Sequence, residues 1–176
     1  RNPLNVYGNS KYLGELAVQK YVEKYFIVRI AWVFGINGKN FINTMLNLGL
    51  THDRLTVVSD QIGTPTYTYD LSRLLVDMAE SDKYGIYHAT NEGGYISWYD
   101  FTVEIMKQAA KYNDKYSKVE VLPVGSDMYP AKAKRPSNSR MDKSKLKNQG
   151  FEPLPDWKDA LSRYLQQKME IENGTN

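Results

Sequence analysis

Apolar and polar positions follow two different rhythms along this chain, and the two rhythms alternate. Apolar residues spaced three and four positions apart predict helices, and short runs of β-branched and aromatic residues predict buried strands. The predicted helices cover residues 7–25, 41–50, 69–81, 97–111 and a last segment that begins at 156. The predicted strands cover residues 26–34, 55–59, 86–89 and 119–123. Helices that alternate with strands are typical of an α/β fold whose mainly parallel sheet is flanked by helices.

Three segments carry the clearest signals. The run 26–34 is almost wholly apolar, as expected of a strand buried on both faces of a parallel sheet. Helix 69–81 has one apolar face and begins near Asp70, a residue type that often caps helices. Ser97 and Asp100 have the spacing of a capping box. The residues expected to point inward are Leu13, Leu16, Ala17 and Tyr21 in the first helix, Leu71, Leu74, Leu75, Met78 and Ala79 in helix 69–81, and Trp157, Leu161, Tyr164 and Leu165 in the last helix.

The composition excludes several functional classes. The 176 residues are 41% hydrophobic and 24% charged, which suits a compact globular domain. A net charge of +3 is too small and too dispersed to indicate a nucleic-acid or membrane partner. The chain has no cysteine, so disulfides, thiolate zinc ligands and thiol nucleophiles are excluded. No apolar run reaches the roughly 20 residues of a membrane-spanning helix, and no signal-peptide pattern opens the chain, so we expect a cytoplasmic protein.

A tyrosine and a lysine near the start form the candidate catalytic pair. Tyr7 and Lys11 are four residues apart, which places the phenol and the ammonium on one face of the predicted helix. A free tyrosine has a pKa near 10, and a neighbouring cation favours its ionised form, so the pair suits proton transfer to a carbonyl or alcohol oxygen. The spacing alone leaves a structural interpretation open, because Tyr164 and Lys168 repeat it on the apolar face of the last helix.

The surrounding motifs carry more information than the pair itself. They are residues 3–11 (PLNVYGNSK), 28–35 (VRIAWVFG), 38–41 (GKNF), 58–66 (VSDQIGTPT), 85–88 (GIYH), 97–99 (SWY) and 134–140 (KRPSNSR). In this order and spacing, the chain resembles the extended short-chain dehydrogenases/reductases and, more narrowly, the dTDP-4-dehydrorhamnose reductase family. It departs from that family at Ile30 and Ala31, where Thr and Ser are common.

The resemblance implies an oxidoreductase of dTDP-rhamnose and polysaccharide biosynthesis that uses NADPH or NADH. It implies that Tyr7 protonates the 4-keto oxygen of a dTDP-sugar while a nicotinamide delivers hydride, and that Lys11 contacts the nicotinamide ribose. Both residues are therefore catalytic and cofactor-binding candidates. The family also raises the possibility of Mg²⁺, although the sequence contains no recognisable metal site.

The same resemblance implies a substrate site. Trp32 falls where the family places an indole against the deoxysugar, and Asn40 and Phe41 open a segment that borders the nucleotide-sugar cleft. Arg135 matches a basic loop in which an arginine can neutralise the diphosphate. Trp98 is interpreted as a packing residue.

The resemblance further implies the last part of a Rossmann-like parallel sheet plus a smaller α/β substrate-binding region. Residues 1–58 are expected to belong to the nucleotide-binding domain, and residues 59–170 mainly to the substrate-binding region, with some segments returning to the sheet. The Gly-rich loop that binds a pyrophosphate is absent, and helix 7–25 has no strand before it. We therefore expect the C-terminal portion of a longer enzyme, inactive by itself, with either a homodimer partner or the missing N-terminal segment covering its exposed edge.

The leading hypothesis is reduction of dTDP-4-dehydro-L-rhamnose to dTDP-L-rhamnose. Two alternatives stay open. One is a non-catalytic regulatory subunit of the same fold, as in the methionine adenosyltransferase β subunit. The other is a different nucleotide-sugar reductase or epimerase.

Overall fold

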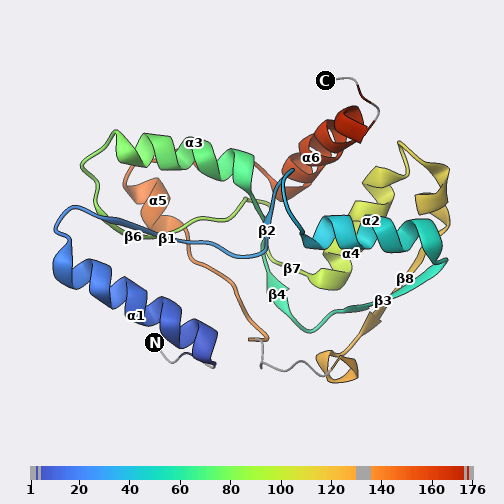
Figure 1. Ribbon diagram of the computed structural model, residues 1–176, viewed down its shortest axis with the longest axis horizontal. Helices are drawn as coiled ribbons and strands as arrows, with labels where there is room; N and C mark the ends of the chain where they lie inside the picture. Colours follow the sequence, from blue (N-terminus) through green and yellow to red (C-terminus); the bar gives the residue numbers. More distant parts are fainter. Residues whose placement is uncertain (1–2, 4, 130–135, 173, 175–176) are drawn as a thin grey trace.

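The fold consists of short strand pairs, mostly parallel, flanked by helices (Figure 1). The computed structural model describes residue 3, residues 5–129, residues 136–172 and residue 174. The helices are α1 (Val6–Tyr21), α2 (Phe41–Thr51), α3 (Thr68–Ala79), α4 (Trp98–Ala109), α5 (Ser144–Asn148) and α6 (Trp157–Glu172), with 3-10 turns η1 (Asp114–Lys118) and η2 (Ser126–Met128). The strands are β1 (Phe26–Arg29), β2 (Val33–Phe34), β3 (Arg54–Val58), β4 (Ile62–Gly63), β5 (Thr66–Tyr67), β6 (Gly85–His88), β7 (Ile96–Ser97) and β8 (Glu120–Val124).

Strands that are distant in sequence form each pair. β1 pairs with β6, β2 with β5 and β3 with β8, all in parallel, whereas β4 and β7 are antiparallel. In Figure 1 the β1–β6 pair lies between α1 and α3, and the β3–β8 pair lies at the other end of the molecule beside α2 and α4. The α/β class with parallel strands agrees with the prediction from the sequence.

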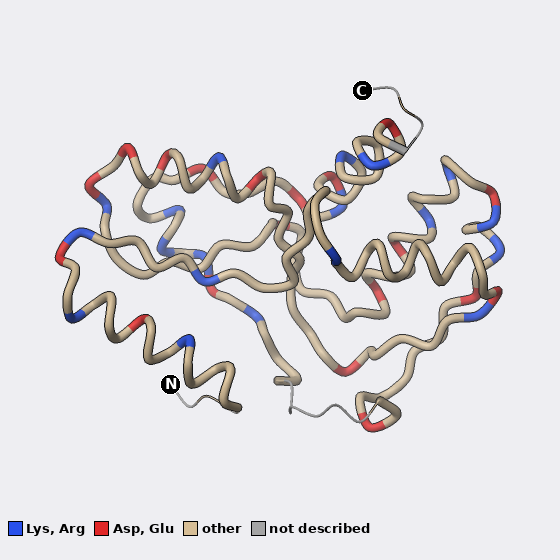
Figure 2. The backbone as a smooth tube through the Cα atoms, viewed as in Figure 1, with Lys and Arg blue, Asp and Glu red and all other residues tan. Residues whose placement is uncertain are grey.

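Two hydrophobic cores match these two ends. The larger contains Phe34, Ile42, Met45, Leu46, Leu55, Val57, Tyr67, Phe101, Ile105, Met106, Ala109, Tyr116, Trp157, Ala160, Leu161, Tyr164 and Leu165. The smaller contains Leu71, Leu74, Met78, Tyr87, Ala89, Leu146, Phe151 and Leu154. The inward face predicted for the last helix is therefore confirmed. Charged residues of both signs are interspersed along the chain (Figure 2), and none of the described helices is long and apolar enough to cross a bilayer.

The prediction of one buried strand over 26–34 is wrong. The run divides into β1 and β2, and β1 is half-buried along its length rather than buried on both faces. Between them Trp32 adopts a φ of +48°, which turns the backbone out of the extended conformation. Thr66 holds this break, because its hydroxyl donates to the Ala31 carbonyl at 2.6 Å and its amide donates to the Trp32 carbonyl at 3.1 Å.

The start of α3 also differs from its prediction. The residue before the helix is Tyr67, whose side chain makes no capping bond, and Asp70 lies inside the first turn, buried at 5% exposure. Asp70 forms an ion pair with Arg163 of α6 instead of capping α3. Leu75 and Ala79 of its predicted apolar face are exposed. The capping box at the start of α4 is confirmed.

The apolar face predicted for the first helix is present but is not covered by the described residues. α1 contains no buried residue, and Leu13 and Tyr21 are 55% and 75% exposed. Glu15 joins α1 to the sheet by accepting a hydrogen bond from Nε of Arg29 in β1, at 2.7 Å. The periodicity therefore identified the helix, but burial of its apolar face does not follow from the periodicity.

Candidate active site

The Tyr7–Lys11 pair lies in the first turns of α1. The Asn5 side chain begins the helix by accepting the Gly8 amide at 2.8 Å. Tyr7 follows and is 71% exposed, and Nζ of Lys11 lies 5.5 Å from the centre of its ring. The phenol and the ammonium are thus on one face, adjacent and open to a ligand. This arrangement can present a proton donor next to a fixed positive charge.

One turn further along, the same helix is tied to the sheet. Arg29 donates to Glu15, and its pKa is raised chiefly by that hydrogen bond. The guanidinium also lies 3.4 Å from Nε2 of His88. Because Nδ1 of His88 lies 3.0 Å from the Asp142 carbonyl and must donate there, Nε2 is the acceptor toward Arg29. His88 therefore has a structural role. The contacts that run from Asp142 through His88 and Arg29 to Glu15 hold α1 against β1.

Aromatic side chains from three elements form a second candidate surface. The indoles of Trp32 and Trp98 stack with centroids 3.7 Å apart and planes 13° from parallel. Phe41, the first residue of α2, lies 4.5 Å from Trp98. All three rings are half-buried and pack against the larger core. They form an aromatic cluster (Trp32, Phe41 and Trp98) that has area available for a flat or apolar ligand group.

Trp32 reaches this cluster through a strained backbone. A left-handed conformation costs an L-residue about 1–2 kcal/mol, and the hydrogen bonds from Thr66 hold Trp32 in it. Gly63 makes room for the indole, because a Cβ on this glycine would lie 2.8 Å from Cε2 of Trp32. Such strain persists where the surroundings over-determine it, and it is concentrated at functional sites.

Of the two polar residues predicted for the substrate site, Asn40 and Arg135, the structure describes only Asn40. Asn40 caps α2 by accepting the Asn43 amide at 3.0 Å, and its Nδ2 donates to the Gly35 carbonyl and to the Tyr164 hydroxyl. Its amide is thus engaged within the protein and fixes the start of α2, and a contact with substrate stays a prediction. Arg135 lies outside the described residues.

The structure brings Trp32 and Phe41 together, through a residue that the sequence did not mark as functional. Trp98 contacts both rings, whereas its interpretation from the sequence was packing alone. Because Trp98 directly follows the Ser97 cap, the sequence could have indicated that its backbone is held in place. Nothing near it in the sequence indicates that its ring contacts Trp32. Tyr7 and Lys11 belong to a separate element, α1, and form the other part of the candidate site.

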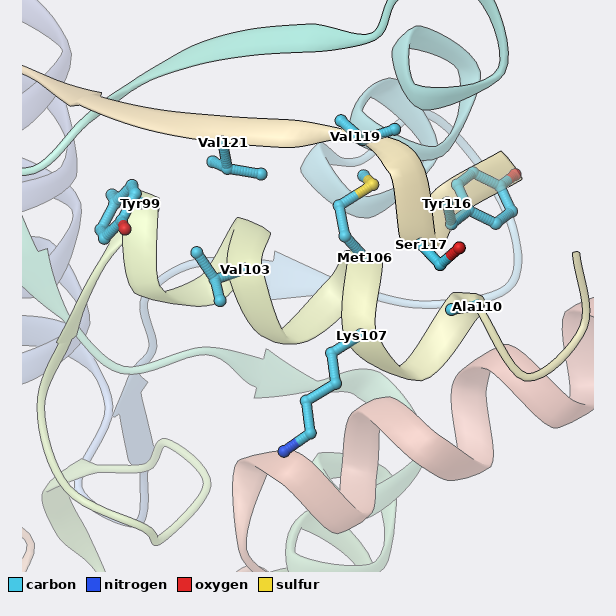
Figure 3. A pocket seen from close by; sticks show the side chains of 9 residues that line it. All are labelled: Tyr99, Val103, Met106, Lys107, Ala110, Tyr116, Ser117, Val119 and Val121. Carbon is cyan, nitrogen blue, oxygen red and sulfur yellow. The ribbon is translucent and has the colours of Figure 1, made fainter. Parts of the chain in front are cut away.

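A groove of about 470 Å³ lies elsewhere, between α4, η1 and β8 (Figure 3). Its lining is mostly apolar and includes Tyr99, Val103 and Met106. It contains none of the residues predicted for the site. Among the residues that the structure describes, no group of three or more His, Asp or Glu side chains could hold a metal ion.

Parallel strand pairs flanked by helices, with an exposed Tyr–Lys pair on one helix, place the chain among the Rossmann-like α/β proteins. The chain belongs to the RmlD substrate binding domain family, whose model matches residues 1–170. The resemblance inferred from the motifs is therefore confirmed.

Relatives of known name support the same assignment. The dTDP-4-dehydrorhamnose reductase of Aggregatibacter actinomycetemcomitans is 41% identical over 167 residues, which are 91% of this chain and 56% of that protein. A crystal structure of a dTDP-4-dehydrorhamnose reductase from Clostridium acetobutylicum matches with a TM-score of 0.89 and 40% identity, covering 96% of this chain and 57% of the other. The Bacillus anthracis enzyme in complex with NADP matches with a TM-score of 0.85 and 38% identity, covering 94% and 56%. The chain spans a little over half the length of these relatives.

Proposed function

We propose that this chain forms the substrate-binding part of a reductase that converts dTDP-4-dehydro-L-rhamnose to dTDP-L-rhamnose with NADPH or NADH. The observation that carries the proposal is the Tyr7–Lys11 pair, adjacent and solvent-facing on α1. The names of relatives at about 40% identity support the substrate, and the NADP in a similar structure supports the cofactor.

The reduction adds hydride to C4 of the sugar and a proton to its keto oxygen, and the pair can supply the proton. Tyr7 donates its phenolic proton as negative charge develops on that oxygen. Lys11 stabilises the phenolate that remains, because an adjacent cation favours the ionised form of an acid. The nicotinamide, when bound, supplies the hydride.

The residues present fit such a cofactor. Gly8 and Ser10 lie between the members of the pair and are small, and the Ser10 hydroxyl bonds back to the Tyr7 carbonyl at 2.8 Å rather than projecting over the face. Lys11 is exposed, so its ammonium can reach a ribose hydroxyl. For the sugar nucleotide, Trp32 and Phe41 offer apolar faces to the deoxysugar and its neighbouring groups, and Arg135 offers charge to the diphosphate.

The test uses the protein expressed from the complete reading frame that contains these residues. Tyr7→Phe removes the proton donor and is expected to lower kcat by roughly 10²–10⁴-fold, measured as NADPH consumption with the 4-keto sugar. Tyr21→Phe is the matched control, because Tyr21 is an equally exposed tyrosine of α1 with Lys20 4.9 Å from its ring. Near-normal turnover by Tyr7→Phe would refute the proposed mechanism.

Calorimetry with dTDP-L-rhamnose separates the enzyme from the non-catalytic alternative. A reductase binds this product, whereas a regulatory subunit of the same fold is expected to bind no dTDP-sugar. Binding without turnover of the 4-keto sugar would instead favour another nucleotide-sugar reductase or an epimerase.

Other expectations from the sequence stay predictions. They are the division into a nucleotide-binding part (1–58) and a mainly substrate-binding part (59–170), a homodimer partner as one of two alternatives for covering the exposed edge, a cytoplasmic location, and the Mg²⁺ that only the family resemblance raises. Size-exclusion chromatography with light scattering and activity measured after treatment with a chelator test the dimer and the metal.

A further inference from the structure

Two independent elements fix the position of Trp98. Ser97 caps α4 by accepting the Asp100 amide at 3.0 Å, and Asp100 in return accepts the Ser97 amide at 2.8 Å. Ser97 is also the last residue of β7 and pairs with Ile62 of β4. Trp98, the next residue, is therefore attached to a strand and to the first turn of a helix at once, and its backbone has little freedom.

Trp32 lacks this kind of support for its side chain. Within the described residues its indole Nε1 makes no hydrogen bond, and the ring packs against Trp98 and Phe101. One face of the indole lies against Trp98, with the ring centroids 3.7 Å apart, and a Cβ on Gly63 would lie 2.8 Å from Cε2 of the indole. Its backbone, with φ at +48°, does not follow the strand alternation that would otherwise direct the side chain.

We propose that Trp98 is a positioning residue that holds the Trp32 indole in the orientation in which it receives the sugar nucleotide. The proposal rests on the proposed function, because Trp32 is the residue expected to touch the sugar. Trp98 acts by covering one face of Trp32, which restricts the orientations open to the indole. Without that cover, the ring can rotate about its χ angles, and ligand binding must then restrict it again.

The test measures the dissociation constant of dTDP-L-rhamnose by calorimetry, with the protein from the complete reading frame. Trp98→Leu is expected to weaken binding about tenfold, in line with the value of an aromatic pair. Trp98→Phe restores a stacking ring and is expected to recover most of the affinity. Tyr99→Leu is the matched control, because Tyr99 is the next residue of the same helical turn, is also half-buried and lines the groove of Figure 3.

A double variant separates positioning from direct contact. If Trp98 acts through Trp32, adding Trp98→Leu to Trp32→Leu causes no further loss of affinity. Losses that multiply would show that Trp98 acts on the ligand directly or through its other neighbour Phe41, and would overturn the proposal. An unchanged dissociation constant in Trp98→Leu would overturn it as well.

Circular dichroism tests the stack without relying on a ligand. Contact between two indoles couples their electronic transitions, so Trp98→Leu and Trp32→Leu should each remove this contribution to the spectrum and Tyr99→Leu should retain it. A spectrum of Trp98→Phe equal to that of the unmodified protein would overturn the stack and the proposal, even if Trp98→Leu did not fold. An indole–indole contribution in a protein that binds no dTDP-sugar would instead refute the proposed function, and with it the role of Trp98 toward that ligand.

Discussion

Arg163 joins two helices through one buried carboxylate, and its removal is expected to destabilise the protein strongly. Its guanidinium donates a hydrogen bond to Oδ2 of Asp70 in α3 at 2.9 Å, and its other terminal nitrogen lies 2.8 Å from Oδ1 of the same carboxylate. Asn91 donates to the same carboxylate at 2.8 Å and accepts the Tyr67 amide, which lies next to the bonds that hold Trp32. The ion pair therefore links α6 and α3 to the strand beside the aromatic cluster.

The magnitude follows from the burial of the two partners. Removing one member of a fully buried pair costs about 3–5 kcal/mol, because the other charge is left without its partner. Asp70 is 5% exposed but Arg163 is 34% exposed, so solvent screens part of the loss. We expect Arg163→Met to lower the free energy of unfolding by about 2–3 kcal/mol.

The assay is urea unfolding followed by tryptophan fluorescence, since Trp157 is buried in the first turn of α6. Asp159→Asn is the control, because Asp159 is the second partner of Arg163, at 2.9 Å, and is 57% exposed. An exposed pair four residues apart on a helix is worth only about 0.3–0.5 kcal/mol. If Arg163→Met costs no more than Asp159→Asn, burial of Asp70 does not govern the strength of this ion pair, and the reasoning is wrong.

Three further predictions concern single positions. Gly63→Ala places a methyl group against the Ser139 hydroxyl and 2.8 Å from the Trp32 indole, and is expected to weaken dTDP-L-rhamnose binding about tenfold. Gly14→Ala, with nothing within 4 Å, should leave calorimetric affinity unchanged. Ser97→Ala removes the cap of α4 and is expected to cost about 1 kcal/mol in urea unfolding; a loss below about 0.3 kcal/mol would contradict the importance of this cap. Burial raises the pKa of Tyr87 in the folded protein. The contribution of its neutral phenol to the free energy of unfolding is therefore complete below about pH 10, and it is lost as the pH rises through the raised pKa of the folded state. Thermal unfolding between neutral and alkaline pH should thus show a steeper alkaline loss in the unmodified protein than in Tyr87→Phe, and equal slopes would count against this reasoning.

Local patterns in the sequence were sufficient for several elements. Ser97 and Asp100 form the predicted capping box because both partners lie within one helical turn. The inward face of α6 follows from periodicity, since residues three and four apart share one side of any helix. Tyr7 and Lys11 lie on one face of α1 for the same reason.

Contacts between distant segments decided the rest. The apolar run 26–34 reads as one strand, and its break at Trp32 depends on Thr66, more than thirty residues away. Asp70 has the chemistry of a helix cap, yet its ion pair with Arg163 spans 93 positions. The sequence by itself determined the five longer helices and which of their side chains share a face, because those properties depend on neighbours along the chain, whereas the short α5 (Ser144–Asn148) is not among the predicted helices. Only the tertiary structure decided that Trp32 is held against Trp98, because that contact joins a strand break to a helix start and depends on the packing of both elements.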